Sequence, residues 1–282
     1  MADASAIRWD QNVKCDLCGS KDHESLRKDE RYGYTFVRCR GCGLMFYNPR
    51  YEEQYVIETF LRAGDAQIEA QNMVERGVFF GDPEGGPEHQ KKALQDYYRF
   101  ILKEHTGWYN KLNGGRAPDS MFEVGSSVGW YMKVAREDFL KGPKGPLVQG
   151  CDANVYSAEA GQRAFRLDIR DGSFLGYNTT PEQMGRFALA TMLDYIEHTY
   201  TPFQDLKKMR DMTAPHGVLL LKTFLEEMDP QGLFVQPVFH SHHFTAITLR
   251  RAIEDAGWKI HVFDMERDRV HGLVTVYAER LP

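Results

Sequence analysis

The chain has 282 residues, 42% of them hydrophobic, and a formal net charge of -5 from 35 basic and 40 acidic residues. This length supports one large hydrophobic core and a small additional module. The near balance of charges gives no general electrostatic basis for binding nucleic acid or an anionic membrane. No apolar signal region opens the sequence, and no stretch reaches the roughly 18 apolar residues of a membrane span. We therefore expect a cytoplasmic protein without a membrane segment.

The cysteines are concentrated at the front of the chain in two CxxC pairs, within CDLCGS and CRGCG. In a cytosolic chain such pairs indicate a metal rather than disulfides. Four thiolates satisfy tetrahedral Zn²⁺ and close the site to water. The alternative, a redox dithiol, needs only one CxxC near a βαβ pattern. We predict a zinc ribbon over residues 1–50 with a structural zinc ion bound by Cys15, Cys18, Cys39 and Cys42.

Residues 51–112 show the periodicity of helices. YEEQYVIETFLRA has apolar residues at helical spacing, and after a break rich in glycine and proline a second apolar stripe runs from Leu94 to Leu112. We expect this stripe to pack on the main sheet. The aromatic segments at 78–80 and 96–100 offer an alternative role as a lid over a site.

From residue 113 to the end, strand and helix patterns alternate. The strand candidates are MFEV, LVQGCD, RLDIR, FALATM, GVLLLK, WKIHVF and LVTVYA, with helical segments between most of them. This order predicts an α/β fold with a Rossmann-like, doubly wound, seven-stranded sheet. In such a sheet a ligand binds at the carboxyl ends of the strands.

The loop after the first of these strands has the composition of a ligand-binding loop. In MFEVGSSVGWY, Glu123 ends the strand, and Gly125, Ser127 and Gly129 follow at two-residue steps. Glycines let a backbone pass close to a ligand, and serine is a small replacement for one. The spacing is neither that of a dinucleotide fingerprint nor that of a P-loop. Asp152 ends the next strand, where an acid can accept both hydroxyls of a ribose, although it could also cap the following helix.

Several motifs in chain order make the sequence recognisable. CRGCGLMFYNPR, FEVGSSVGWY, GCDAN, FALATMLDYIEHTYTPFQDLKKM, APHGVLLLKT and HHFTAITLRRAIEDAGWKI occur at the spacing of a known family. The chain resembles class I S-adenosylmethionine-dependent methyltransferases, specifically the group with an N-terminal four-cysteine zinc ribbon. Ser127 departs from that family's commonest first motif, which has glycine there.

The resemblance implies roles for individual residues. Glu123 would meet the amino group of the cofactor's methionine, and Gly125, Ser127 and Gly129 would pass beside its methionine and ribose portions. Asp152 would take the ribose hydroxyls. Asp171 or Ser173 would reach the adenine, and Leu193 would pack near the adenine ring.

Methyl transfer needs alignment and sometimes a base. Candidate bases follow the strands: His198 in DYIEH, and His240 and His243 in FHSHHFT. Orienting a loop is an equally good role for His198, and bonding the backbone of a turn is one for His243. We expect FHSHHFT to be irregular and the next helix to start near Thr245.

The resemblance favours a small-molecule methyl acceptor, a sugar or another metabolite. An RNA methyltransferase that grips RNA with its ribbon is one alternative, and the net acidity weighs against it. A non-catalytic binding scaffold is the other.

Overall fold

The main body of the protein is a mixed seven-stranded sheet. The computed structural model describes residues 8–30, 33–61, 87–143, 145–229, 240–269 and 272–282. The sheet order is β12-β13-β10-β9-β6-β7-β8, with β13 antiparallel to both neighbours and the remaining pairs parallel. Its strands are β6 Ser120–Val124, β7 Leu147–Asp152, β8 Asp168–Asp171, β9 Phe187–Leu193, β10 Thr213–Phe224, β12 Trp258–Asp268 and β13 Leu273–Arg280. The predicted Rossmann-like sheet and its seven strands are confirmed.

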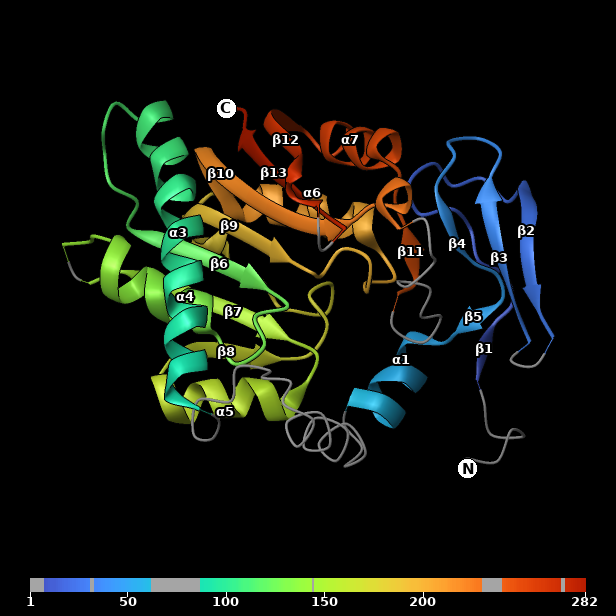
Figure 1. Cartoon of the computed structure of the whole chain (residues 1–282), viewed down its shortest axis with the longest axis horizontal. Coiled ribbons are helices and arrows are strands. Elements are labelled where there is room, and N and C mark those ends of the chain that lie inside the picture. Colours follow the sequence, from blue (N-terminus) through green and yellow to red (C-terminus); the bar gives the residue numbers. More distant parts are fainter. Residues whose placement is uncertain (1–7, 31–32, 62–86, 144, 230–239, 270–271) are drawn as a thin grey trace.

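Helices cover both faces of this sheet (Figure 1). One face carries α3 (Glu88–Leu112), α4 (Trp130–Val134) with its π-helical continuation η3 (Ala135–Phe139), and α5 (Val155–Phe165). The other face carries α6 (Pro202–Met212) and α7 (Ala246–Asp255). Two short 3₁₀ turns, η4 (Pro181–Gln183) and η5 (Glu226–Met228), lie in the connections.

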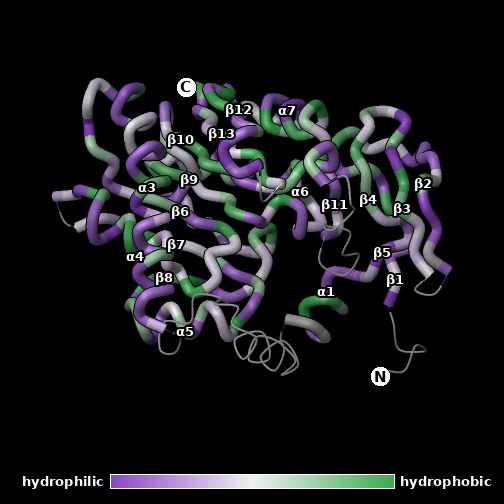
Figure 2. The backbone as a smooth tube through the Cα atoms, viewed as in Figure 1, coloured by the Kyte–Doolittle hydropathy of each residue, from purple (hydrophilic) through white to green (hydrophobic). Residues whose placement is uncertain are grey.

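Strand periodicity divides the core into two layers. In β6, Met121 packs in the layer formed with α3, α4 and α5, whereas Phe122 packs in the layer formed with α6 and α7. Successive side chains of a strand point to opposite faces, so a sheet covered on both sides needs apolar residues at nearly every position. Figure 2 shows hydrophobic residues along the central strands β9 and β10, while β2 at the outer edge is mostly hydrophilic.

The long helix α3 is tied to the sheet by a buried histidine. His105 is fully buried, with Nδ1 2.9 Å from the Tyr131 hydroxyl and Nε2 2.9 Å from the Val218 carbonyl oxygen. Burial lowers the pKa of His105 to about 4. A neutral imidazole that bonds through both nitrogens fixes the register of α3 over the sheet. The predicted apolar stripe therefore belongs to a helix packed on the sheet.

The ribbon is a second, smaller sheet at the N-terminal end. Its order is β11-β4-β3-β2, and a two-stranded pair β1-β5 lies beside it. The bounds are β1 Trp9–Asp10, β2 His23–Asp29, β3 Tyr34–Cys39, β4 Met45–Tyr47, β5 Arg50–Tyr51 and β11 His242–His243. Strand β3 lies between the two cysteine pairs and ends at Cys39. The edge strand β11 comes from much later in the sequence than the other three and joins the ribbon to the main body.

The histidine segment is therefore more ordered than the sequence predicted. FHSHHFT was expected to be irregular, but His242 and His243 pair antiparallel with Phe46 and Met45 of the ribbon. The expected helix start is confirmed: Thr245 is the N-cap of α7, and its hydroxyl accepts the Thr248 amide at 3.1 Å. The prediction of irregular structure was wrong because two residues are too few to show the period of a strand. The strand with which they pair also lies almost two hundred positions earlier in the chain.

The connection between ribbon and main sheet begins with a short helix. It consists of α1 (Glu53–Val56) and a π-helical turn η2 (Ile57–Leu61). The aromatic segment at 78–80, considered for a lid, lies outside the described residues. The domain limits at 50 and 112 stay a prediction. Within the described ranges, every helix is too short or too polar to cross a membrane.

Candidate functional site

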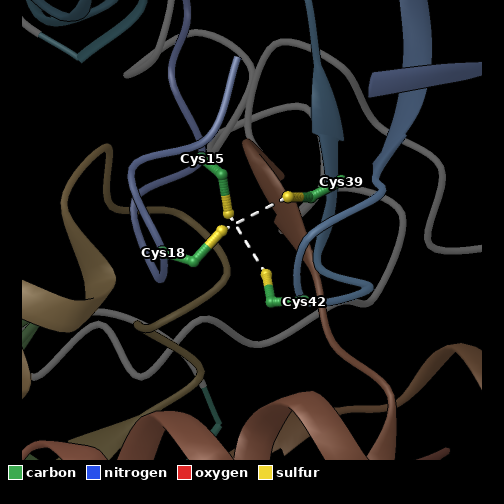
Figure 3. Close-up of side chains that lie close together, drawn as sticks. All are labelled: Cys15, Cys18, Cys39 and Cys42. Atoms are coloured by element: carbon green, nitrogen blue, oxygen red, sulfur yellow. Dashed lines mark hydrogen bonds between the residues drawn. The ribbon is translucent and has the colours of Figure 1, made fainter. Parts of the chain in front are cut away.

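The four N-terminal cysteines converge on one point (Figure 3). Their sulfur atoms all lie within 4.8 Å of one another. The Sγ atoms of Cys15 and Cys42 are 3.3 Å apart, and those of Cys18 and Cys39 are 3.4 Å apart. Tetrahedral zinc with Zn–S bonds of about 2.3 Å places its sulfur atoms about 3.8 Å apart. The donor set therefore fits zinc after a small expansion of the cluster.

Each CxxC pair folds into a tight turn, which we call a cysteine knuckle. The Gly19 amide donates to the Cys15 carbonyl at 2.7 Å, and the Gly43 amide donates to the Cys39 carbonyl at 2.9 Å. Both glycines have positive φ, 73° and 86°, which glycine adopts without strain. The hydrogen bond between the two thiols lowers the pKa of Cys42 and raises that of Cys15, so a metal that binds all four thiolates must displace protons from the cluster.

A cavity of about 770 Å³ opens at the carboxyl ends of the parallel strands. The arrowheads of β6, β7 and β9 point toward this side, where α1 and the ribbon also lie (Figure 1). The loops after β6, β7, β8 and β9 line the cavity, together with α1, η2 and α3. This is the position that a doubly wound sheet gives to its ligand.

The loop after β6 has the backbone shape that its glycines predicted. Gly125, Ser127 and Gly129 all have positive φ, at 66°, 50° and 78°. A Cβ atom on Gly129 would lie 2.6 Å from a methyl carbon of Leu167, and one on Gly125 would lie 2.9 Å from the ring of Tyr195. Ser127 adopts the left-handed conformation despite its side chain. The backbone at 127 therefore has the conformation that glycine adopts most easily.

Glu123 is buried beneath this loop with an unsatisfied oxygen. Its side chain is 3% exposed, and Oε2 has no hydrogen-bond partner among the described residues. Burial, with the nearby charge of Asp152, raises the pKa of Glu123 well above its usual range. An orphaned buried carboxylate oxygen is costly unless a ligand supplies a donor or a positive charge. Its place in the cavity wall makes a ligand ammonium group a suitable partner.

Asp152 stands opposite the loop at the end of β7. Its Oδ2 accepts the Ser127 amide at 2.7 Å and its Oδ1 accepts the Asn154 amide at 2.7 Å. Asn154, rather than Asp152, is the N-cap of α5, because the Asn154 side chain accepts the amides of Tyr156 and Ser157. The helix-cap alternative for Asp152 is thus taken by another residue, and the carboxylate remains in the cavity wall.

The other residues expected near the cofactor divide between two hollows. Ser173 and Leu193 line the main cavity, whereas Asp171 lines a neighbouring hollow of about 600 Å³. The backbone of Gly172 and the ring of Phe174 complete the main cavity at this point. Asp171 is therefore outside the described lining of the main cavity, although the residues that follow it, Gly172 and Ser173, belong to that lining.

The three candidate bases differ in their access to the cavity. His198 lines it and has a side chain 39% exposed, with Nε2 4.0 Å from Oε1 of Glu197. The His240 ring packs on His198, with centroids 4.7 Å apart, but His240 is outside the described lining. His243 is fully buried toward the ribbon, with Nδ1 3.0 Å from a Glu226 oxygen.

Comparison with known proteins identifies the family. A family model described as "Methyltransferase domain" matches residues 88–261, which is more than half of the chain. The chain belongs to this methyltransferase family. No curated protein matches the sequence.

Solved structures with similarity to this methyltransferase include a chain of the Haloferax volcanii complex between the Trm112 methyltransferase activator and a methyltransferase. That match has 14% identity, covers 68% of this chain and 96% of that one, and has a TM-score of 0.49. An S-adenosylmethionine-dependent methyltransferase from Listeria monocytogenes matches at 10% identity, 62% and 99% coverage and a TM-score of 0.49. One from Mesorhizobium loti matches at 13% identity, 62% and 100% coverage and a TM-score of 0.46. The family assignment rests on the family model, because TM-scores this low carry no argument.

The protein is therefore a class I S-adenosylmethionine-dependent methyltransferase. Its cavity fits the cofactor: an orphaned carboxylate suits an ammonium group, and a second carboxylate suits hydroxyls. Sequence reasoning missed the walls supplied by Glu53, Asp194 and Tyr200. Asp194 carried a signal, since it directly follows the strand end at Leu193, whereas Glu53 comes from the connecting segment and carried none. Tyr98 belongs to the aromatic segment 96–100 that was considered for a lid, and it lines the cavity from α3.

Two substitutions in the loop after β6 should differ in their effect on stability. Ser127→Gly relieves a left-handed backbone, a gain of about 1–2 kcal/mol, but adds about 0.4–1 kcal/mol of unfolded-chain entropy. We expect its free energy of unfolding to stay within about 1 kcal/mol of wild type. Gly129→Ala adds strain and a clash and should lose about 2 kcal/mol or more. Chemical denaturation measures both, and equal losses in the two variants would contradict this description of the loop.

Proposed function

We propose that this methyltransferase acts on a small-molecule acceptor, such as a sugar or another metabolite. The supporting observation is the cavity itself, which has the volume of a small-molecule site. Its described lining contains the carboxylates of Glu53, Glu123, Asp152 and Asp194, and no lysine or arginine. With two of these carboxylates assigned to the cofactor, Glu53 and Asp194 remain for a neutral or positively charged acceptor.

An RNA acceptor is disfavoured by the charges of the ribbon. Nucleic-acid binding needs a surface of unneutralised cations facing the phosphates. Arg38 pairs with Glu24 at 3.1 Å, Arg40 with Asp22 at 3.5 Å, and Lys28 with Glu30 at 3.5 Å. These pairs partly neutralise three of the cations on the described part of the ribbon.

The chemistry asked of the protein is alignment and, for some acceptors, removal of a proton. Bound S-adenosylmethionine supplies an electrophilic methyl group on a sulfonium. In the proposed arrangement Glu123, the loop at 125–129 and Asp152 hold the cofactor, and Ser173 and Leu193 border it, with Asp171 behind them. His198 is the proposed base, because among the three candidates it is the one that lines the described cavity.

The neighbouring residues Glu197 and His240 are compatible with His198 acting as a general base. Burial and the charge of Asp194 raise the pKa of Glu197 to about 8, so this carboxyl is mostly protonated at neutral pH. His240 packs against the His198 ring and is proposed to orient it. His243, bonded to Glu226 on the ribbon side, is proposed to stabilise the junction rather than to act on substrate.

We further propose that the four-cysteine cluster holds one structural zinc ion. Elemental analysis of protein purified without chelator should find one zinc per chain. Cys39→Ser removes a ligand, and because metal binding and local folding are coupled, it should lose zinc and several kcal/mol of stability. Cys151→Ser, at a buried cysteine outside the cluster, is the control that should keep its zinc. Zinc-free wild-type protein would contradict the proposal.

Asp152→Ala should weaken cofactor binding by about 1–3 kcal/mol, the cost of losing a charged hydrogen-bond acceptor. Titration calorimetry with S-adenosylhomocysteine measures this directly. Asp168→Ala removes an exposed acid on the neighbouring strand β8 and should leave the affinity unchanged. Equal affinity for the wild type and Asp152→Ala would show that the carboxylate is not in the cofactor site.

His198→Ala should lower methyl transfer by about 10²-fold, the usual contribution of a general base, while cofactor affinity is kept. Incubation with isotopically labelled S-adenosylmethionine and fractionated metabolite extract, followed by mass spectrometry, identifies the acceptor and measures the rate. His89→Ala, at an exposed histidine of α3, is the control. Normal turnover by His198→Ala on the identified acceptor would show that His198 is not the general base. Transfer only to an RNA fraction would support the alternative acceptor class.

A further inference from the structure

The ribbon contacts the cavity loop after β9 at three separate places. Residues 197–203 include His198, Thr199 and Tyr200, which line the cavity, and they end in the first turn of α6. We propose that the ribbon positions this segment, with Asp16, Arg50 and the strand β11 as its points of attachment. The description of residues 197–203 as the side of the cavity that receives the methyl acceptor rests on the proposed function. The contacts between this segment and the ribbon do not depend on that function.

The first attachment runs through β11, which lies between the ribbon and the segment. One edge of β11 pairs with β4 of the ribbon. On the other side, the His242 amide donates to the Glu197 carbonyl at 3.1 Å, and the Ser241 hydroxyl donates to the Thr199 carbonyl at 2.6 Å. Ser241 and His242 are 4% and 1% exposed, so these bonds are shielded from water. Two backbone carbonyls of the cavity loop are thus fixed by a strand that the ribbon holds in place.

The second attachment is Arg50, in strand β5 shortly before the connecting helix. Its guanidinium lies 4.4 Å from the centroid of the Tyr200 ring, and Nη1 lies 3.5 Å from the Tyr200 carbonyl oxygen. The Arg50 side chain is 13% exposed, so the cation–π contact is partly desolvated and correspondingly stronger. Because Tyr200 lines the cavity, Arg50 sets the position of a wall residue.

The third attachment is Asp16, inside the first cysteine knuckle. Its Oδ2 accepts the Phe203 amide at 2.7 Å, in the first turn of α6. The natural N-cap residue, Thr201, makes no side-chain capping bond, so Asp16 supplies the missing acceptor from another part of the chain. A carboxylate is also favourable beside the positive end of the helix dipole. The knuckle that carries Cys15 and Cys18 is thereby linked directly to the end of the cavity loop.

The ribbon also shares a hydrophobic core with the main body. This core includes Val124 and Cys151 on the cofactor side, so the polar attachments, and not the core, distinguish the two halves. Cys39, Leu44 and Phe46 of the ribbon belong to the same cluster as Phe244 and Leu249 at the start of α7. The cofactor half is held differently, since Glu123 and Asp152 end β6 and β7 and the loop at 125–129 leads into α4. Weakening the ribbon attachments should therefore loosen one half of the cavity and spare the other.

The test compares the full-length variants Asp16→Ala, Asp16→Asn and Arg50→Gln with the control Arg38→Gln, a ribbon cation on the solvent side. Hydrogen–deuterium exchange of residues 197–203 and of residues 123–129 is measured in each, with calorimetric affinity for S-adenosylhomocysteine. Asp16→Ala and Arg50→Gln should speed exchange at 197–203 by about tenfold or more, because local opening loses a charge-assisted contact. Exchange at 123–129 and the affinity should stay at the wild-type values.

Asp16→Asn keeps an oxygen acceptor for the Phe203 amide and should restore slow exchange, which distinguishes positioning from general destabilisation. Unchanged exchange at 197–203 in both Asp16→Ala and Arg50→Gln would overturn the inference, as would an equal rise in both regions. Failure of the wild type to bind S-adenosylhomocysteine would instead count against the cofactor site and leave the exchange comparison valid.

Discussion

The arrangement of this protein depends on a short backbone pairing between β4 of the ribbon and β11, which lies almost two hundred residues later in the chain. β11 closes the ribbon sheet on one side, and on the other side His242 and the adjacent Ser241 bond the carbonyls of the cavity loop. Backbone hydrogen bonds in a buried strand have no water to replace them, so the pairing fixes both partners at once. We therefore infer that the ribbon supports the cavity loop after β9 from outside the cavity, since the described lining contains no ribbon residue.

The two halves of the cavity are built from different kinds of structural element. The half assigned to the cofactor consists of strand ends and glycine turns from consecutive βα units, whose geometry follows from the parallel sheet. The opposite half combines the connecting helix, Tyr98 of α3 and the loop before α6. The carboxyl groups of Glu53 and Asp194 lie on this side, and burial raises the pKa of both. Such a division lets one half stay constant in shape while the other is adapted to an acceptor.

The sequence predicted those structural elements that depend on residues close together in the chain or on a regular hydrophobic period. The seven strands of the main sheet, the cysteine cluster and the Thr245 cap all depend on residues that are near one another in sequence or on a regular period. The first-motif loop was predictable for the same reason, because positive φ at Gly125 and Gly129 is a local requirement. The roles assigned to Glu123, Asp152 and His198 stay predictions, and their positions around one cavity are consistent with those roles.

What the sequence did not reveal depends on contacts between distant segments. Nothing near Asp16 indicates that it caps a helix at Phe203, and nothing near His242 marks it as a ribbon strand. Burial of His243 toward Glu226 likewise could not be read from the HSHH pattern.

The most direct test of the whole account is a crystal structure of the zinc-loaded protein with S-adenosylhomocysteine. We predict the ligand's amino group at Glu123, its ribose at Asp152 and its sulfur facing the side of the cavity formed by His198 and Tyr200. A ligand bound elsewhere, or with its sulfur turned away from that side, would contradict the account.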